Sequence, residues 1–264
     1  MFELNKIYNV DSYEAIKNIP DKSIDLIITD PPYQIDTIGS KTGSNLCKNI
    51  TKTMDELKEA DIIDGLNTDI LEQFMRVMKK PNIYIWCNKK QIPDYLEFFV
   101  KKHKCKFEIM VWCKTNPIPA FGGNYLNDKE FCLYFRKNIK LTTKYETAFT
   151  YWVSKCNIED KKLYSHPTIK PLNIIEKLVL NSSKENDVIL DTFCGSGTTC
   201  IASKKHNRNF IGFEINKKYV DISNKRLEKV VVIKNNQEEI NTKQMSIFDY
   251  LEEENNGKEE KNEF

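Results

Sequence analysis

The sequence is most informative at residues 23–33, which read SIDLIITDPPY. The run before Asp30 is apolar enough for a buried strand. Two consecutive prolines cannot continue a sheet ladder because neither has an N–H group to donate, so we expect the strand to end at Asp30. The chain then leaves as a rigid extended loop, which brings a carboxylate, backbone carbonyls and the Tyr33 ring to the carboxyl end of a strand. In open α/β sheets this is where ligands bind.

The loop Asp30-Pro31-Pro32-Tyr33 has the groups needed to hold a nucleobase that has left its helix. Asp30 and the carbonyl of Pro31 can accept hydrogen bonds from an exocyclic amine, and the Tyr33 ring can stack on the base. Four residues match by chance in many proteins, so an ordinary strand-ending turn explains this loop equally well when it is taken alone.

A second informative stretch, residues 188–202, reads VILDTFCGSGTTCIA. It predicts a strand over 188–191, a glycine-rich turn that lets the backbone approach a ligand, and then a helix. The next strand, 209–214, ends in Glu214 about 20 residues after the turn, where a doubly wound fold places a carboxylate for ribose hydroxyls. Neither the full G-x-G-x-x-G spacing nor the G-K-[ST] of a phosphate loop is present, so a nucleoside without phosphates fits best.

Strands and helices alternate along the chain. Apolar runs predict strands over residues 6–11, 23–29, 82–87, 107–112, 130–135, 188–191 and 209–214, and helical spacing predicts helices over 12–18, 69–80, 93–102 and 172–180 and from 198 onward. This alternation is typical of an α/β fold with a doubly wound, mostly parallel sheet. We expect one catalytic domain over residues 1–234.

Two segments of this domain lack a clear period. Residues 34–53 are polar and predict a mobile loop beside the end of the first buried strand. This loop is either a plain surface loop or a functional one, as a lid or as a segment that contacts DNA. Residues 138–165, the second part of a predicted insertion over 115–165, interleave basic and aromatic side chains. This mixture suits a small inserted region for target recognition on a nucleic acid, and equally a β-rich insertion with its aromatic residues packed inward.

Composition narrows the class of protein. The 264 residues, 30% of them charged, are typical of a globular protein. No apolar run approaches the length of a membrane span and the start is not a signal peptide, so we expect a cytoplasmic protein. Eight cysteines without a C-x-x-C pair and three scattered histidines predict reduced, mostly buried thiols and no metal site.

The charge is unevenly distributed. Residues 235–264 hold nine acidic and three basic side chains, so this tail carries −6 and the body +8 of the net +2. A basic body is consistent with a nucleic-acid partner, and the tail is predicted to be disordered. Within it, Gln244–Leu251 resembles the short peptide by which bacterial replication proteins dock on the sliding clamp. A short helix that packs on the body is the alternative.

Taken together, the motifs resemble the DNA amino-methyltransferases that use S-adenosylmethionine. DPPY matches the catalytic motif of that family, DTFCGSGTT its cofactor loop, and HPTIKP (166–171) a third motif that precedes the cofactor loop. The catalytic motif comes first and the cofactor loop last, as in the permuted β group. The resemblance covers roughly residues 5–230, and three motifs in this order make coincidence improbable.

The resemblance implies a role for each matching residue. The catalytic residues would be Asp30, Pro31, Pro32 and Tyr33. Glu214 would hold the ribose hydroxyls of S-adenosylmethionine, and Lys170, with Thr168, would approach its carboxylate. Asp191 would order the loop or meet the methionine amino group, and Asp11 would lie near the adenine, although either could simply cap the following helix. The turn itself would line the cofactor with Phe193, Gly195, Ser196, Gly197 and Thr198.

The implied reaction is methylation of an exocyclic amine in DNA by direct displacement, after the base has left the helix. Aspartate before PPY favours adenine N6, whereas serine is more usual for cytosine N4, which stays the alternative substrate. A non-catalytic nucleic-acid-binding module, and methylases of RNA or protein, are further alternatives. The target sequence, a restriction partner and the choice between monomer and homodimer stay open.

Overall fold

The computed structural model describes residues 2–33, 66–117, 125–156 and 169–233. Within these ranges the strands form one eight-stranded sheet in the order β1-β8-β7-β2-β3-β5-β4-β6. Their bounds are β1 Lys6–Asn9, β2 Leu26–Thr29, β3 Asn82–Cys87, β4 Lys106–Lys114, β5 Lys129–Arg136, β6 Tyr151–Ser154, β7 Val188–Asp191 and β8 Asn209–Glu214.

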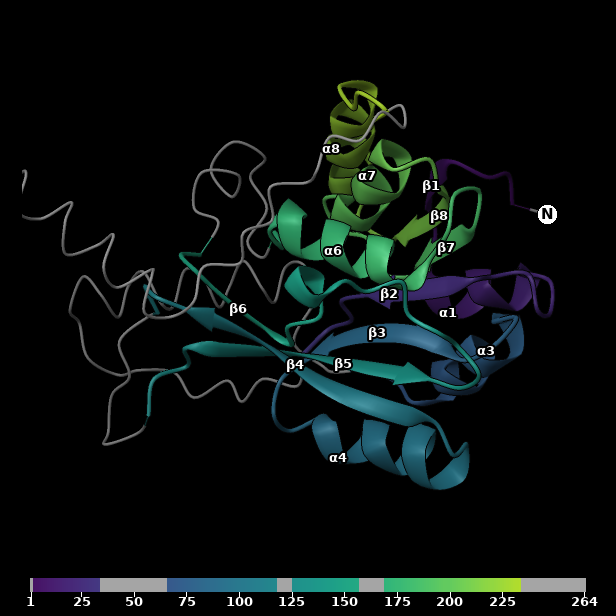
Figure 1. Ribbon diagram of the computed structural model, residues 1–264. Coiled ribbons are helices and arrows are strands. Elements are labelled where there is room, and N and C mark those ends of the chain that lie inside the picture. The colour runs from purple at the N-terminus through teal and green to yellow at the C-terminus, as the bar shows by residue number, and fades with distance from the viewer. Residues whose placement is uncertain (1, 34–65, 118–124, 157–168, 234–264) are drawn as a thin grey trace, which may run out of the picture.

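Helices connect the strands and cover the sheet (Figure 1). Their bounds are α1 Ser12–Ala15, continued by the 3-10 turn Ile16–Asn18; α3 Asp69–Val77; α4 Ile92–Tyr95, continued by the π-helical turn Leu96–Lys102; the 3-10 turn Tyr145–Thr147; α6 Leu172–Ser182; α7 Thr198–Lys205; and α8 Lys217–Glu228. Among the described strands only β5 runs antiparallel to its neighbours, β3 and β4. The predicted doubly wound, mostly parallel sheet is therefore confirmed.

The sheet has a switch point between β7 and β2, which are paired in parallel. From β7 the chain proceeds to β8 on one side, whereas from β2 it proceeds to β3 on the other. The connections that leave these two strand ends therefore diverge, and a crevice opens between them at the carboxyl edge of the sheet. Asp30 follows β2, and Asp191 is the last residue of β7.

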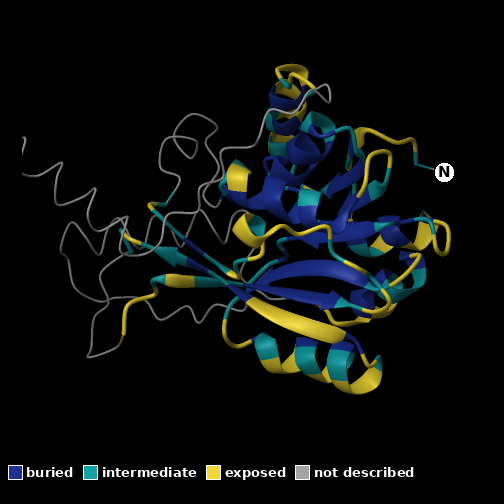
Figure 2. Cartoon of the chain, viewed as in Figure 1, coloured by how far each residue is buried: buried dark blue, intermediate teal, exposed yellow. Residues whose placement is uncertain are grey.

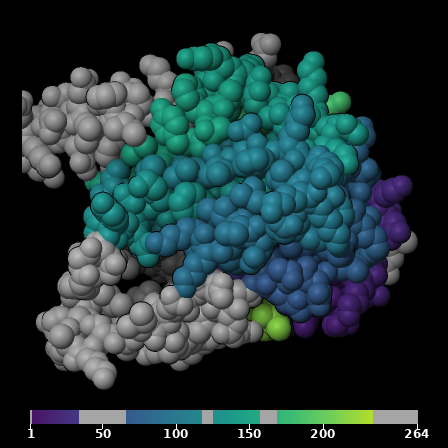
Figure 3. Space-filling view, turned by 90° about the horizontal axis from the view of Figure 1, so that it is seen from below, coloured from purple at the N-terminus to yellow at the C-terminus, as the bar shows by residue number. Residues whose placement is uncertain are grey.

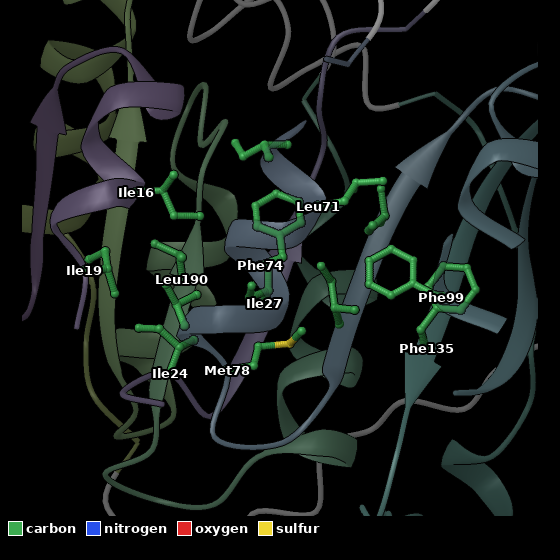
Figure 4. Packing of buried hydrophobic residues seen from close by; sticks show 14 of the residues in the cluster. Ile16, Ile19, Ile24, Ile27, Leu71, Phe74, Met78, Phe99, Phe135 and Leu190 are labelled. Atoms are coloured by element: carbon green, nitrogen blue, oxygen red, sulfur yellow. The ribbon is translucent and has the colours of Figure 1, made fainter. Parts of the chain in front are cut away.

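The central strands β2 and β3 are buried along their whole length, as the colours of Figure 2 show, and both faces of the sheet are covered. One face packs against α1, α3 and the α4 region. Its core is shown in Figure 4, where Phe99 and Phe135 stack with ring centroids 4.5 Å apart. The other face packs against α6, with Tyr84, Trp86 and Trp152 in its core. Seen from below, the segment from α3 to β5 forms most of the surface (Figure 3).

Most predicted elements are present, with shifted ends. The strands 82–87, 188–191 and 209–214 match their predicted bounds, whereas the helix predicted over 69–80 ends at Val77 because the backbone of Met78 is extended. Helix α8 was not predicted from the sequence. It lies against β1 and α7, and its residues Val220 and Leu227 belong to a third, smaller core.

Candidate active site

The first half of the site is the end of β2. The strand is fully buried up to Thr29, and the chain turns away at Asp30, as the two prolines require. The carbonyl of Pro32 accepts a hydrogen bond from Gln91 Nε2 at 3.1 Å, which ties the loop to the start of α4. The loop is thereby held as a defined extension of the sheet edge.

The Asp30 carboxylate uses both of its oxygens within the protein. Tyr33 donates its hydroxyl proton to Oδ1 at 2.9 Å, and the ammonium of Lys170 pairs with Oδ2. The Tyr33 ring, predicted to stack on a base, is half-buried and orients the carboxylate through its hydroxyl. Lys170 was predicted to meet the carboxylate of the cofactor. The structure places its ammonium on Asp30, and the cofactor contact stays a prediction.

Two further charged residues, not predicted from the sequence, extend this pair. Glu130 Oε2 lies 3.2 Å from Lys170 Nζ, and Glu130 Oε1 pairs with the ammonium of Lys114. The four groups alternate in sign, from Asp30 through Lys170 and Glu130 to Lys114. The only sequence signal was the acid that opens the apolar run EFCLYF, an unusual residue for the start of a buried strand.

Burial and pairing perturb all the acidic and basic groups at the centre of this network. Burial raises the pKa of Asp30, and Lys170 opposes that change. Burial would also raise the pKa of Glu130, but Lys170 and Lys114 outweigh it and hold that pKa at about 2. Desolvation would lower the pKa of Lys170, yet Asp30 and Glu130 together raise it above its ordinary value. The network thus holds two carboxylates beside permanent cations.

The second half of the site is the glycine turn after β7. Gly195 and Gly197 have φ of +48° and +79°, a region that other residues rarely adopt. Helix α8 supports this turn from behind. Ser223 Oγ donates to the Gly195 carbonyl at 2.8 Å, and a Cβ on Gly197 would lie 2.9 Å from Ser223 Cβ. The turn therefore has its shape because glycine occupies both positions and α8 packs closely against them.

Ser196 and Thr198, predicted to line the cofactor, are both buried against α8. Arg226 donates to the Ser196 carbonyl at 2.5 Å and to the Thr198 hydroxyl at 3.4 Å. Like Ser223, Arg226 was not predicted from the sequence. The apolar spacing of Val220 and Leu227 in α8 could have indicated this helix and the residues on its inner side.

Three acids end adjacent strands around this turn. Asp11 follows β1 and accepts from the Tyr13 backbone N at 2.8 Å, which caps α1 as the alternative interpretation expected. Asp191 accepts from the Phe193 N at 3.2 Å and so orders the turn. Glu214 accepts from the Gly195 N at 2.9 Å through one oxygen and from the following turn through the other.

The hydrogen-bond acceptors around this turn fit S-adenosylmethionine. A carboxylate has more acceptor positions than the backbone bonds that these acids receive, so the remaining positions can take hydroxyl and ammonium donors. The three acids also suit the positive charge that the sulfonium cofactor carries. Phe193 adds an apolar surface, and its ring meets Tyr13 edge-on with centroids 6.0 Å apart. Burial raises the pKa of Asp191 to about 7.

The two halves of the site are joined directly. Thr29, the last residue of β2, and Thr192, the first residue after β7, share a hydrogen bond between their hydroxyls at 3.0 Å. Ser12, at the start of α1, donates to the Thr192 carbonyl. The predicted catalytic loop and the predicted cofactor turn therefore meet at the switch point of the sheet, although more than 150 residues separate them in the chain.

Several predictions fall wholly or partly outside the described residues. Thr168, the loop 34–53 and the tail 235–264 with Gln244–Leu251 lie there. In the predicted insertion, some aromatic residues are packed inward and others are exposed, and recognition of DNA by this region stays a prediction. Trp152 is buried against Trp86, whereas Tyr145 keeps 80% of its surface exposed.

The described residues bear on three other predictions. None of their His, Cys, Asp and Glu side chains forms a group of three or more suited to a metal ion. Their seven cysteines are free thiols, five of them buried. No helix in these ranges is long and apolar enough to span a membrane.

Comparisons with known proteins agree with this geometry. The DNA methylase family model of the N6/N4 type matches residues 24–225. The type II methyltransferase M.HinfI of Haemophilus influenzae is 32% identical over 258 residues, which cover 86% of this chain and 69% of that protein. The type II methyltransferase M2.LlaDCHI of Lactococcus lactis subsp. cremoris is 31% identical, with 84% and 89% covered.

Solved structures have the same fold. The M1.HpyAVI complex with S-adenosylmethionine has a TM-score of 0.61 at 27% identity, over 84% of this chain and 99% of that one. The cytosine-N4-specific PvuII DNA methyltransferase has a TM-score of 0.62 at 17% identity, over 87% and 86% of the two chains, and supports the fold alone.

Proposed function

This chain belongs to the N6/N4 family of DNA methylases, and we propose that it transfers the methyl group of S-adenosylmethionine to the N6 amine of adenine at a specific DNA site. One observation carries the proposal. The hydroxyls of Thr29 and Thr192, 3.0 Å apart, bring the Asp30 loop and the glycine turn to one crevice. S-adenosylmethionine is the cofactor of this family, as in the M1.HpyAVI complex. When bound, it supplies an electrophilic methyl group.

The amine of adenine is a poor nucleophile because its lone pair is delocalised into the ring. Hydrogen bonds from that amine to Asp30 and to the Pro31 carbonyl draw the nitrogen toward a tetrahedral geometry and expose the lone pair. Orientation by the rigid prolines supplies much of the remaining acceleration. Asp30 is a suitable acceptor because Tyr33 fixes one of its oxygens and the loop is anchored through Pro32.

The other site residues hold the cofactor. Asp11, Asp191 and Glu214 offer acceptors at the ends of adjacent strands. Phe193 and the turn over residues 195–198 form the surface between these acids, and Thr168 and Lys170 lead into the crevice from the third motif. Adenine is favoured over cytosine because aspartate precedes the two prolines, as is more usual in family members that act on adenine N6.

The decisive experiment is mass spectrometry of nucleosides from unmodified DNA that has been incubated with the protein and S-adenosylmethionine. We expect N6-methyladenine with the wild-type protein and none with Asp30→Ala. N4-methylcytosine in its place would correct the base but keep the chemistry. No methylated nucleoside from single- or double-stranded DNA would refute the proposal and direct the search to RNA or protein.

Recognition of DNA would fall to the region 115–165. Its exposed Tyr145 and the basic side chains around it, including Lys140 and Lys144, suit contact with phosphates and bases. Because the substrate is DNA, we place the enzyme in the cytoplasm.

The tail segment Gln244–Leu251 is proposed to bind the bacterial sliding clamp. Deletion of residues 241–264 should abolish clamp binding in a pull-down and preserve methylation of short duplexes, whereas unchanged clamp binding would refute this role.

A further inference from the structure

Both oxygens of Asp30 already accept from side chains of the protein. Tyr33 occupies Oδ1 and Lys170 occupies Oδ2. The target amine needs one of these acceptors, and the ammonium of Lys170 is a donor of the same kind. Lys170 therefore competes with the proposed substrate for Oδ2, and its withdrawal would free that oxygen for the target amine.

Lys170 cannot simply be displaced into the protein interior. Its side chain is 7% exposed, and a buried ammonium left without a carboxylate beside it is strongly destabilised. Its other close neighbours are the rings of Trp86 and Tyr33, with centroids 5.0 and 5.5 Å from Nζ. Aromatic faces attract a cation, but more weakly than a carboxylate does. A second buried acceptor is needed.

Glu130 provides that acceptor. Its Oε2 is buried, lies 3.2 Å from Lys170 Nζ, and accepts no well-aligned hydrogen bond from any residue that the structure describes. Its other oxygen is held by Lys114, at the end of β4. The carboxylate is thus fixed from one side and presents an unused lone pair to Lys170 on the other. A small rotation of the lysine side chain would turn this ion pair at 3.2 Å into a well-aligned hydrogen bond.

We propose that Glu130 is a positioning residue for the methyl transfer, which takes over the ammonium of Lys170 so that Asp30 can accept the target amine. This inference rests on the proposed function and adds to it a step that precedes the chemistry. Lys170 stays charged and paired throughout, moving between two carboxylates, and no bond is made or broken. Lys114 keeps Glu130 in place from the strand that leads into the proposed recognition region.

The proposed movement of Lys170 between Asp30 and Glu130 can be detected through the pKa of Asp30. The negative charge of Glu130 raises the pKa of Asp30, and the positive charge of Lys170 lowers it. Removing either charge should therefore move the acidic limb of the rate profile, and in opposite directions. Other titratable groups near Asp30 come from the loop itself, from three strands of the sheet and from α4, and they are Tyr33, Cys87, Cys132, Asp191 and Tyr95. These groups are unchanged in the variants below.

The test compares Glu130→Gln with a matched control, Glu108→Gln, on the exposed part of neighbouring β4. Initial rates of N6-methyladenine formation are measured on unmethylated plasmid DNA, as a function of DNA concentration and of pH. In Glu130→Gln, Lys170 has only Asp30 as a full counter-charge and competes with the target amine. We expect kcat to fall by roughly tenfold or more, with little change in KM for DNA, because phosphate contacts dominate that affinity.

The pH profiles of the rate distinguish a positioning role of Glu130 from a purely structural one. The acidic limb should move to lower pH in Glu130→Gln and to higher pH in Lys170→Met, whereas Glu108→Gln should match the wild type. Glu130→Asp keeps the charge, so its limb should stay at the wild-type pH even if its rate is lower. If Glu130→Gln folds poorly, Glu130→Asp takes its place in the rate measurements.

Two results would overturn the inference. One is a Glu130→Gln protein with the kcat and acidic limb of the control. The other is a Glu130→Asp limb displaced as far as that of Glu130→Gln. If the wild-type protein itself produces no methylated nucleoside, the proposed function fails and the inference fails with it, which is a different outcome from an active wild type that does not depend on Glu130.

Discussion

Asp30 and Glu214 end strands at the same edge of the sheet, but the protein holds them differently. Asp30 is bound by side chains, the hydroxyl of Tyr33 and the ammonium of Lys170. Glu214 is bound by backbone N–H groups, those of Gly195 and Asn216. Side-chain partners can exchange when a rotamer changes, whereas backbone partners move only with the chain. The catalytic end is therefore adjustable and the cofactor end is rigid.

The largest effect should come from Asp30→Asn, which breaks the adjustable end alone. An amide offers one neutral acceptor oxygen in place of a charged carboxylate, so the target amine is no longer polarised and Lys170 loses one of its two carboxylate partners. We expect kcat to fall by about a hundredfold or more. Calorimetric titration with S-adenosylmethionine should give an unchanged Kd. A loss of cofactor affinity as large as the loss of rate would contradict the division between the two ends.

The next effect should come from Gly197→Ala, which breaks the rigid end. The added Cβ would lie 2.9 Å from Ser223 Cβ at a φ of +79°, so the turn or α8 has to shift. We expect unfolding to become easier by about 1–3 kcal/mol, with a marked loss of cofactor affinity, read from urea denaturation and calorimetric titration.

Ser223→Ala is the comparison for that variant. It removes only the hydroxyl that donates to the Gly195 carbonyl and leaves the backbone of the turn unstrained. It should therefore cost about 1 kcal/mol at most. A Gly197→Ala protein no less stable than Ser223→Ala would show that the turn adapts, and that it is not rigid.

The smallest effect should come from Asp191→Asn, which tests a carboxylate at the junction of the two ends. Burial raises the pKa of Asp191 from its ordinary value of 3.8 to about 7. The folded protein therefore binds more protons than the unfolded chain between these values, so this group makes wild-type stability fall as pH rises from about 4 to about 7. The penalty stays constant above pH 7.

Asp191→Asn has no such titration. Relative to the wild type, it should gain stability across that pH window, by about 1 kcal/mol once relaxation of the site is allowed for. Urea denaturation at pH 5 and at pH 8 measures the difference. A stability difference between the two proteins that is the same at both pH values would show that Asp191 does not titrate in this range.

Sequence patterns located the elements that the local chain controls. The proline pair ended β2 at Thr29 because proline cannot donate to a ladder, and glycines marked the turn after β7 because its backbone requires positive φ. Helix α8 was not predicted from the sequence, and neither were the roles of its residues Ser223 and Arg226. Their importance depends on a carbonyl from a different part of the chain, which no local pattern reveals.

By itself, the sequence determined most of the strands and helices, the end of the catalytic strand, the glycine turn and the family to which the chain belongs. These depend on residues close together in the chain, through backbone hydrogen bonding and apolar spacing. Only the tertiary structure decided that Lys170 lies on Asp30 and that Glu130 and Lys114 complete the network. Pairing of buried charges depends on distances between strands and loops far apart in sequence, and those distances exist only once the sheet has assembled.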